Sequence, residues 1–240
     1  MKEISKLYWF VKNLFRYALV NKIPQNWDFE GPEDYWEKRI KEGRDIDISY
    51  PMMIEISEQI IKDKSRVLDI GCGNGAFLAA LKRNKSILEL GIDSSSTAIA
   101  MTKNNGVKAK IFDLLIGNLE ELGEFDYVTC FEVLEHIQNA EFFMKKLIST
   151  FNNAQFIFSI PNTGFIYHRM RLLLGRFPKQ WVIHPAEHVR FWTKKDFKLV
   201  LEDLGFEVIK IYAASTPIFL STKYPGLFSE SLIFHLKKFK

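Results

Sequence analysis

Short apolar runs alternate with amphipathic segments from residue 65 onward. The runs are rich in β-branched and aromatic residues and predict strands, while the segments between them have helical periodicity. Strands are expected at residues 66–70, 88–92, 107–112, 127–131 and 155–160, and helices at 76–83, 97–104 and 132–151. Strands separated by helices of this length predict parallel βαβ units.

The C-terminal part has a different pattern. Residues 194–204 predict a helix that ends at Gly205, and strands are expected at 206–212 and 231–238. Because no comparable helix separates these two strands, we expect them to pair antiparallel. The predicted fold class is therefore α/β, with a Rossmann-like, mostly parallel seven-stranded sheet, helices on both faces and a C-terminal antiparallel strand pair.

The chain is expected to divide into an N-terminal helical extension or lid, residues 1–60, and a main domain, residues 61–240. Residues 1–22 mix apolar and basic side chains, so they form either a helix packed on the domain or an interfacial helix in weak peripheral contact with a membrane. Residues 32–43 predict a second helix, with proline near its start and glycine just past its end. Residues 161–193 are expected to be an insertion that covers the substrate.

Composition narrows the class of protein. Among 240 residues, 47% are hydrophobic and 26% are charged, which is ordinary for a globular protein with a real core. A net charge of +4 permits an anionic small molecule but gives no reason to expect nucleic acid. Neither a secretion signal nor a membrane-spanning segment is recognisable, and the two cysteines do not form a metal-type pair. These features predict a cytoplasmic protein.

The stretch RVLDIGCGNGA, residues 66–76, fits two glycine patterns. Gly71, Gly73 and Ala76 match G-x-G-x-x-A, a fingerprint of loops that bind the pyrophosphate of NAD or FAD. With Gly75 as the third position, the pattern becomes G-x-G-x-G, which resembles the nucleotide loop of S-adenosylmethionine (SAM) methyltransferases. The glycines alone leave both cofactors open.

Three acidic side chains lie at the ends of the first three predicted strands, where a doubly wound sheet binds its ligands. Asp93 can accept hydrogen bonds from both ribose hydroxyls, which NAD and SAM share. Asp113 can accept from an adenine amino group while Leu114 offers its backbone N–H, or Asp113 simply caps the strand end. Asp69 either lies near a cofactor ammonium or only braces the amides of the loop.

Residues 66–212 resemble a class I SAM-dependent methyltransferase through four motifs in order. VLDIGCGNG matches the first motif, GIDSS the ribose-binding acid, IFDLL the adenine-binding segment and FDYVTCFEVLEHI the fourth strand. The resemblance implies that the cofactor is SAM and the product S-adenosylhomocysteine. It also implies that the cofactor contacts Asp69, Gly71, Cys72, Gly73, Gly75, Asp93, Ser94, Asp113, Leu114 and Phe131.

Candidate catalytic residues follow the fourth strand. Methyl transfer needs a general base only where the acceptor keeps a proton of high pKa. On a helix, Glu132, Glu135 and His136 would share one face. Their ExxEH spacing resembles ubiquinone-biosynthesis O-methyltransferases and small-RNA 2′-O-methyltransferases, in which such residues, with a later histidine, hold magnesium. Here that histidine is His188. We expect these four side chains to be catalytic rather than metal-binding, with a structural turn as the alternative for Glu135 and His136.

The segment after the fifth strand resembles a MetW-like branch of the superfamily through its proline–asparagine pair and RLLLGR run. Its basic side chains would bind an acidic acceptor or form a solvated face: Arg169, Arg171 and Arg176. Its aromatic side chains would line a pocket for a flat or lipid-like acceptor or belong to the core: Tyr167, Trp181 and Trp192.

The predicted function is methyl transfer from SAM to an oxygen or nitrogen atom of a small-molecule, sugar or lipid-like acceptor. A non-catalytic SAM-binding partner that regulates a biosynthetic enzyme is a second hypothesis. A third is an NAD-dependent oxidoreductase, although the Tyr-x-x-x-Lys pair of such enzymes is missing, since Arg171 follows Tyr167 at that spacing.

Overall fold

The computed structural model describes residues 31–41, 51–178, 188–214 and 219–239. The predicted N-terminal helix at residues 1–22 lies outside this part of the chain. None of the described helices is long and apolar enough to cross a membrane.

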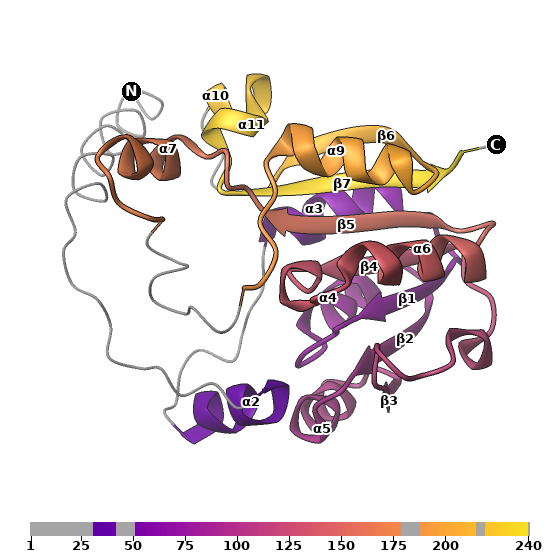
Figure 1. The fold of residues 1–240 in the computed structure, drawn as a ribbon. Helices are drawn as coiled ribbons and strands as arrows, with labels where there is room; N and C mark the ends of the chain where they lie inside the picture. The colour runs from indigo at the N-terminus through magenta and orange to yellow at the C-terminus, as the bar shows by residue number, and fades with distance from the viewer. Residues whose placement is uncertain (1–30, 42–50, 179–187, 215–218, 240) are drawn as a thin grey trace.

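A seven-stranded sheet forms the centre of the molecule, with strand order β3-β2-β1-β4-β5-β7-β6 (Figure 1). Strands β1 to β5 pair in parallel, whereas β7 pairs antiparallel with both β5 and β6. The strands are β1 (Arg66–Ile70), β2 (Leu88–Asp93), β3 (Ala109–Ile111), β4 (Tyr127–Phe131), β5 (Gln155–Pro161), β6 (Phe206–Ala213) and β7 (Ser231–Lys238). The predicted fold class, including the antiparallel C-terminal pair, is confirmed.

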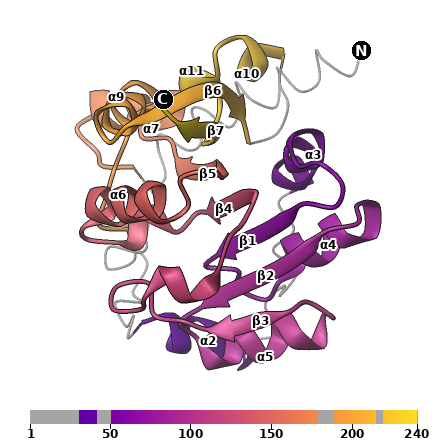
Figure 2. The same cartoon turned by 90° about the vertical axis from the view of Figure 1, so that its right-hand side faces the viewer.

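Helices cover both faces of the sheet. Helices α3 and α4 lie on one side, and α6 and α9 lie on the other (Figure 2). The described α-helices are α2 (Pro32–Lys41), α3 (Pro51–Ile60), α4 (Ala76–Asn84), α5 (Ser96–Asn104), α6 (Ala140–Thr150), α7 (Ile166–Leu173), α9 (Lys194–Asp203), α10 (Phe219–Lys223) and α11 (Pro225–Phe228). Two 3₁₀ turns, η1 (Leu119–Leu122) and η2 (Leu134–His136), complete the set.

The core explains why the strands read as almost continuous apolar runs. Successive side chains of a strand point to opposite faces, and here both faces are covered. In β5, Phe156 and Phe158 join the core beneath α6 and α9, while Ile157 between them joins the core beneath α3 and α4. Helix α3 belongs to this second core through Met53 and Ile56.

The helix expected at residues 132–151 is shorter than predicted, because α6 begins only at Ala140. Glu132 has a φ of 52°, which is incompatible with a right-handed helix, and the 3₁₀ turn η2 follows it. The expectation that Glu132 and His136 share one helical face is therefore wrong.

Smaller differences concern the third strand and the C-terminal connection. Strand β3 covers Ala109–Ile111 rather than residues 107–112, because the Val107 amide donates to the Thr102 carbonyl oxygen of α5 at 3.2 Å and the pairing with β2 begins at Ala109. Between β6 and β7 the chain forms two short helices, α10 and α11.

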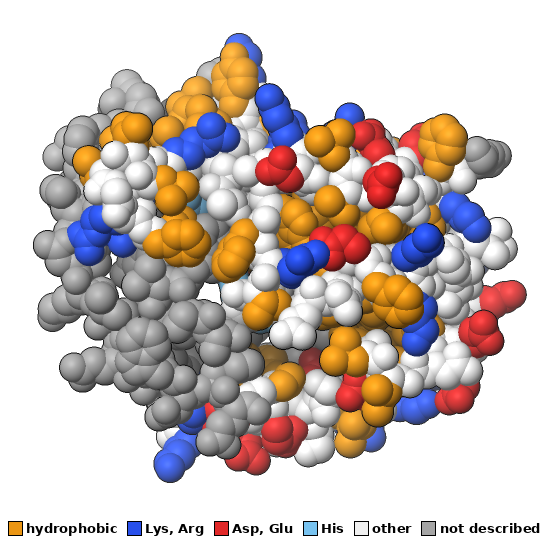
Figure 3. Space-filling view, viewed as in Figure 1, with side chains coloured by type: hydrophobic (Ala, Val, Ile, Leu, Met, Phe, Trp, Pro, Cys, Tyr) orange, Lys and Arg blue, Asp and Glu red, His pale blue; other side chains and the backbone are white. Residues whose placement is uncertain are grey.

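The surface carries no single sign of charge over the face seen in Figure 3. Blue and red side chains are interspersed there among apolar ones in the described part of the chain. This mixture agrees with the small net charge of +4.

Replacing Phe197 by alanine should destabilise the fold by about 3–5 kcal/mol, the usual cost of truncating a buried phenylalanine. Its side chain is 0% exposed, and its ring centroid lies 4.9 Å from that of Phe234 and 5.1 Å from that of Trp192. Urea unfolding would measure the change. The control is Leu199→Ala on the same helix, where the side chain is 65% exposed and the expected loss is about 0.5 kcal/mol. Equal losses in the two variants would contradict this description of the core.

Candidate active site

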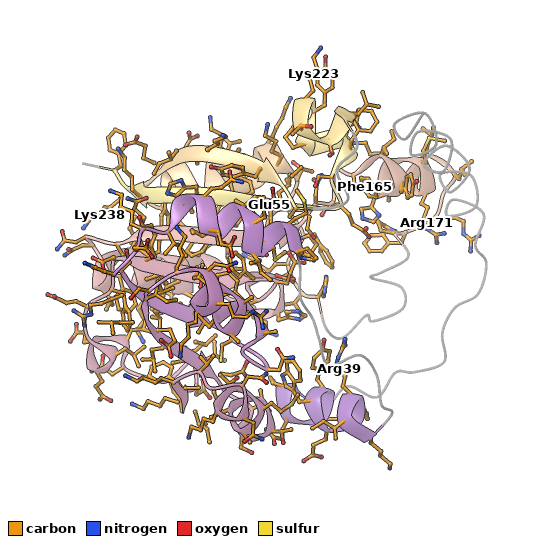
Figure 4. All side chains as sticks on the ribbon, turned by 180° about the vertical axis from the view of Figure 1, so that it is seen from behind. Arg39, Glu55, Phe165, Arg171, Lys223 and Lys238 are labelled. Carbon is orange, nitrogen blue, oxygen red and sulfur yellow. The ribbon has the colours of Figure 1, made fainter. Side chains whose placement is uncertain are left out.

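The carboxyl ends of the parallel strands border a cavity of about 1140 Å³. Helix α2 contributes to its wall, and α7 lies at the same edge of the molecule; Figure 4 labels Arg39 on the first and Arg171 on the second. All predicted site residues except Gly75 line this cavity: Asp69, Gly71, Cys72, Gly73, Asp93, Ser94, Asp113, Leu114, Phe131, Glu132, Glu135, His136 and His188. One cavity therefore joins the predicted cofactor residues to the predicted catalytic ones.

The glycine loop depends on backbone conformations and close approaches that side chains would disturb. Gly73 has a φ of 54°, and a Cβ there would lie 2.7 Å from Cζ2 of Trp36. Gly75 has a φ of 76° and caps the start of α4, where a Cβ would lie 2.6 Å from Cγ2 of Thr102. Gly75 thus shapes the loop without lining the cavity.

Asp93 connects the glycine loop to strand β2. Its Oδ2 accepts a hydrogen bond from the Gly73 amide at 3.0 Å, and its Oδ1 accepts one from the Ser95 amide at 2.9 Å. Burial raises the pKa of Asp93, although these amides favour the charged form. Each carboxylate oxygen has a second lone pair, so the side chain can still accept from a ribose.

Asp69 binds a neighbouring strand rather than the loop. Its Oδ1 accepts a hydrogen bond of 2.6 Å from Oγ1 of Thr129, its partner in the register of β1 and β4. Burial raises the pKa of Asp69 to about 7, against the Thr129 hydrogen bond, and the charge of Asp93 raises it further. The carboxyl therefore titrates near neutral pH.

Asp113 caps the turn that follows β3. Its Oδ1 accepts hydrogen bonds from the amides of Leu115 at 2.8 Å and Ile116 at 3.4 Å. The side chain is exposed where it borders the cavity, and Leu114 lies beside it. The strand-end cap is therefore present, and adenine binding by Asp113 stays a prediction.

A second cluster consists of Glu135, His136 and His188. One ligand atom from each lies within 4.8 Å of the others. Nε2 of His136 lies 3.8 Å from Oε1 of Glu135, and the two imidazole rings meet edge to face with centroids 4.8 Å apart. Such a set of one carboxylate and two imidazoles is chemically suited to a proton transfer or to a divalent cation.

The Glu135 carboxyl has an unusual environment. It is 1% exposed, and neither of its oxygens has a hydrogen-bond partner among the described residues. Burial, and then the charge of Glu132, raises its pKa well above the ordinary range. A buried carboxyl without a hydrogen bond is costly, so a group inside the cavity is a natural hydrogen-bond partner for it.

His188 reaches the cluster through backbone contacts. The amides of Val189 and Arg190 donate to the Glu135 carbonyl oxygen at 2.8 and 3.1 Å. Arg190 also forms an ion pair with Glu141 at the start of α6. Residues distant in sequence are thus brought together around Glu135.

Glu132 faces a different set of partners. Its amide donates to Oγ of Ser159 at 2.9 Å, and its Oε1 accepts from the same hydroxyl at 2.8 Å. Its Oε2 accepts from Oγ of Ser231 at 3.4 Å. Desolvation raises the pKa of Glu132 despite these bonds. Glu132 therefore links the ends of β4, β5 and β7 and does not belong to the Glu135 cluster.

The basic and aromatic residues of the predicted substrate cover have mainly structural contacts. Nε of Arg169 donates to the Gly164 carbonyl oxygen at 2.6 Å, and Nε of Arg171 donates to that of Phe177 at 2.8 Å. Tyr167 and Trp192 are buried in apolar clusters, and none of the four lines the cavity. Arg176 also lies outside the cavity lining, and Trp181 lies outside the described residues.

Several lining residues escaped the sequence analysis. They are Tyr35, Trp36, Phe77, Glu230 and Ser231. The only local sign was the adjacent aromatic pair Tyr35 and Trp36 on a short helix. This sign was weak, because aromatic pairs are as common in protein cores as in binding sites. Ser231 and Glu230 reach the cavity because β7 lies beside β5, which no local pattern predicts.

Replacing Asp69 by asparagine should flatten the pH dependence of stability. A carboxyl whose folded pKa is raised from 3.8 to about 7 stabilises the fold less as pH rises through that interval, because the folded state holds the proton more tightly. Urea unfolding at pH 5 and pH 7.5 would measure the difference. The exposed Glu121 provides the control, since Glu121→Gln should leave the dependence unchanged. An equal pH dependence in wild type and Asp69→Asn would refute the shift.

The chain matches a known protein family. A family model described as "Methyltransferase domain" matches residues 48–211, which is more than half of the chain.

Two curated relatives are ubiquinone biosynthesis O-methyltransferases. That of Rickettsia canadensis (strain McKiel) is 28% identical over 150 residues, covering 60% of this chain and 64% of the relative. That of Xanthomonas oryzae pv. oryzae (strain PXO99A) is 26% identical over 205 residues, covering 78% and 80%. The chain thus matches less than two thirds of the Rickettsia relative's length.

A similar solved structure is a chain from a complex that contains the Haloferax volcanii Trm112 methyltransferase activator. It has a TM-score of 0.65 at 12% identity, covering 88% of this chain and 100% of that one. At this identity the likeness supports the fold alone. The family match, in contrast, favours SAM over NAD for the glycine loop. On this match, the chain belongs to the methyltransferase domain family, and its strand-end motifs resemble those of class I SAM-dependent methyltransferases.

Proposed function

We propose that this methyltransferase transfers the methyl group of SAM to a hydroxyl oxygen of a small-molecule acceptor. The observation that carries the proposal is the buried Glu135 carboxyl, without a hydrogen-bond partner among the described residues, beside His136 and His188. The glycine loop lines the same cavity as these three residues. Cofactor and acceptor can therefore meet inside it.

The cofactor would lie along the ends of β1 and β2. The glycines permit a close approach of the backbone, and Asp93 would accept hydrogen bonds from the ribose hydroxyls. Asp69 has a pKa of about 7, and its ionised carboxylate would pair with the methionine ammonium. Asp113 and Leu114 would border the adenine.

The reaction is an in-line displacement on the sulfonium methyl group. A bond forms between the acceptor oxygen and the methyl carbon while the carbon–sulfur bond breaks, and S-adenosylhomocysteine leaves with the electron pair. The acceptor hydroxyl must lose its proton, and an imidazole titrates in the range that suits this task. His136 is 38% exposed as a side chain and can pass such a proton to solvent.

The same three residues would hold a divalent cation if one binds. The donor set fits, because a carboxylate and two imidazoles lie within reach of one centre and the carboxylate lacks other partners. A cation there would supply Lewis-acid help to ionise the acceptor hydroxyl. Glu132 would not be among the ligands in the arrangement described, since its oxygens accept from Ser159 and Ser231.

The lining favours an uncharged, hydroxyl-bearing acceptor over an anionic one. No lysine or arginine is among the described residues that line the cavity, whereas several carboxyl groups and aromatic rings are. The relatives named as ubiquinone biosynthesis O-methyltransferases support oxygen as the methylated atom. An aromatic ring with adjacent hydroxyl groups combines these requirements.

Replacing both His136 and His188 by alanine should lower turnover about 10²- to 10⁴-fold, the usual contribution of general acid–base catalysis. SAM affinity should stay within about twofold, because neither histidine adjoins the glycine loop. Release of S-adenosylhomocysteine with a panel of catechol-type acceptors would measure turnover, with and without a chelator to test for a metal. His235→Ala is the matched control, since His235 lies on β7 beside Gln155. Normal turnover in the double variant would remove the histidines from the mechanism.

Replacing Asp93 by alanine should weaken SAM binding by on the order of 2–3 kcal/mol, because hydrogen bonds to a charged acceptor are lost. Calorimetric titration with SAM would measure the change, and Asp203→Asn, at an exposed carboxylate of α9, is the control. Unchanged affinity in Asp93→Ala would contradict the cofactor assignment. SAM binding without turnover on any acceptor would instead favour a regulatory partner protein.

A further inference from the structure

Helix α2 carries residues that cover the glycine loop. Pro32, Tyr35 and Trp36 line the cavity, and Trp36 is 7% exposed. Its indole packs directly on Gly73, since a Cβ at that glycine would lie 2.7 Å from the ring. Tyr35 meets the indole edge to face, with ring centroids 5.3 Å apart. This packing puts an aromatic wall beside the loop that is assigned to SAM.

Glu33, on the same side of α2 as Trp36, binds the start of helix α5. Its Oε1 accepts hydrogen bonds from Oγ of Ser96 at 2.9 Å, from Oγ1 of Thr97 at 2.6 Å and from the Thr97 amide at 3.2 Å. Its Oε2 accepts one from the Ser96 amide at 2.8 Å. These bonds, first that from the Thr97 hydroxyl, lower the pKa of Glu33 to about 2. The carboxylate is therefore charged throughout the neutral range.

The contacts of α2 converge on Asp93. The Ser95 amide, just before the residues that Glu33 binds, donates to Oδ1 of Asp93. The Gly73 amide, beneath Trp36, donates to Oδ2 of the same carboxylate. Trp36 packs on Gly73, and Glu33 binds the residues next to Ser95. Asp93 therefore holds both places where this turn of α2 is attached.

We propose that Glu33 is a positioning residue for the cofactor: its carboxylate fastens α2 to the N-terminus of α5, so that Trp36 is held over the SAM end of the cavity. The inference rests on the proposed cofactor location. Glu33 itself does not line the cavity, so it acts through the position of Trp36 rather than by touching SAM. It should determine how tightly SAM is held and not the rate of the methyl-transfer step.

Two variants separate the reach of the Glu33 side chain from its charge. Glu33→Gln removes the charge but keeps a carbonyl oxygen where three of the four hydrogen bonds are accepted. Glu33→Asp keeps the charge but withdraws the carboxylate by one methylene. If α2 is held by these hydrogen bonds, the glutamine variant retains most of the SAM affinity and the aspartate variant does not.

The test is calorimetric binding of SAM together with steady-state kinetics on the full chain. Glu33→Ala should raise both the Kd and the KM for SAM about tenfold, with kcat at saturating SAM changed less than twofold. Glu33→Asp should resemble Glu33→Ala, and Glu33→Gln should lie within about threefold of wild type. Glu37→Ala, at an exposed carboxylate on the same helix, should have no effect.

A double-variant cycle completes the experiment. If Glu33 acts through Trp36, adding Glu33→Ala to Trp36→Ala should cost little further affinity. The inference would be overturned if Glu33→Ala left SAM affinity unchanged, or if the Glu33→Ala and Trp36→Ala effects were fully additive. It would also be overturned if Glu33→Asp kept the wild-type affinity while Glu33→Gln lost it. Failure of the wild-type protein to bind SAM would overturn the proposed cofactor site instead, so the two failures are distinguishable.

Discussion

The hydrogen bonds of the buried Asp93 carboxylate hold together the end of the cavity where we propose that SAM binds. Its oxygens accept from the amides of Gly73 and Ser95, so the glycine loop and the start of α5 are ordered around one side chain. Buried amides and carboxylates without partners are costly, and here each satisfies the other. Because Trp36 packs on Gly73 and Glu33 binds the first residues of α5, the position of α2 depends on the same carboxylate.

The sheet was predictable because burial on both faces leaves a strong local signal. Strands such as β4 and β5 are almost wholly apolar. The glycine loop follows β1, and acidic residues lie at or just past the ends of β2 and β3. Strand β3 is less well defined, since it is short, lies at the edge of the sheet and carries exposed side chains such as Ile111. Its bounds could not be read from residues 107–112, where lysines alternate with apolar residues and the buried Val107 and Phe112 stand at the two ends.

The residues proposed to bind the cofactor could be picked out from sequence because they lie at or just past the ends of β1 to β4. The arrangement at the proposed acceptor end could not be predicted in this way, because it arises from contacts between distant segments. Glu132 takes its conformation from Ser159 and a residue of β7, and the ExxEH spacing suggested a helix that these contacts prevent. His188 lies beside His136 because the chain after it binds the Glu135 carbonyl oxygen. The ExxEH spacing therefore drew attention to Glu132, Glu135 and His136 but did not predict how they are arranged in space.

The strand order also bears on how the protein is made. Strand β6 pairs only with β7 in the described sheet, and β7 is inserted between β5 and β6 although it is the last strand in sequence. During synthesis β5 therefore keeps an open edge, and β6 has no partner, until Ser231–Lys238 leaves the ribosome. Glu132 meets Ser231 only at that stage, so the acceptor end of the cavity is completed after the cofactor end. A nascent chain stalled before β7 would leave the backbone N–H and C=O groups along one edge of β5 open to pairing with other chains.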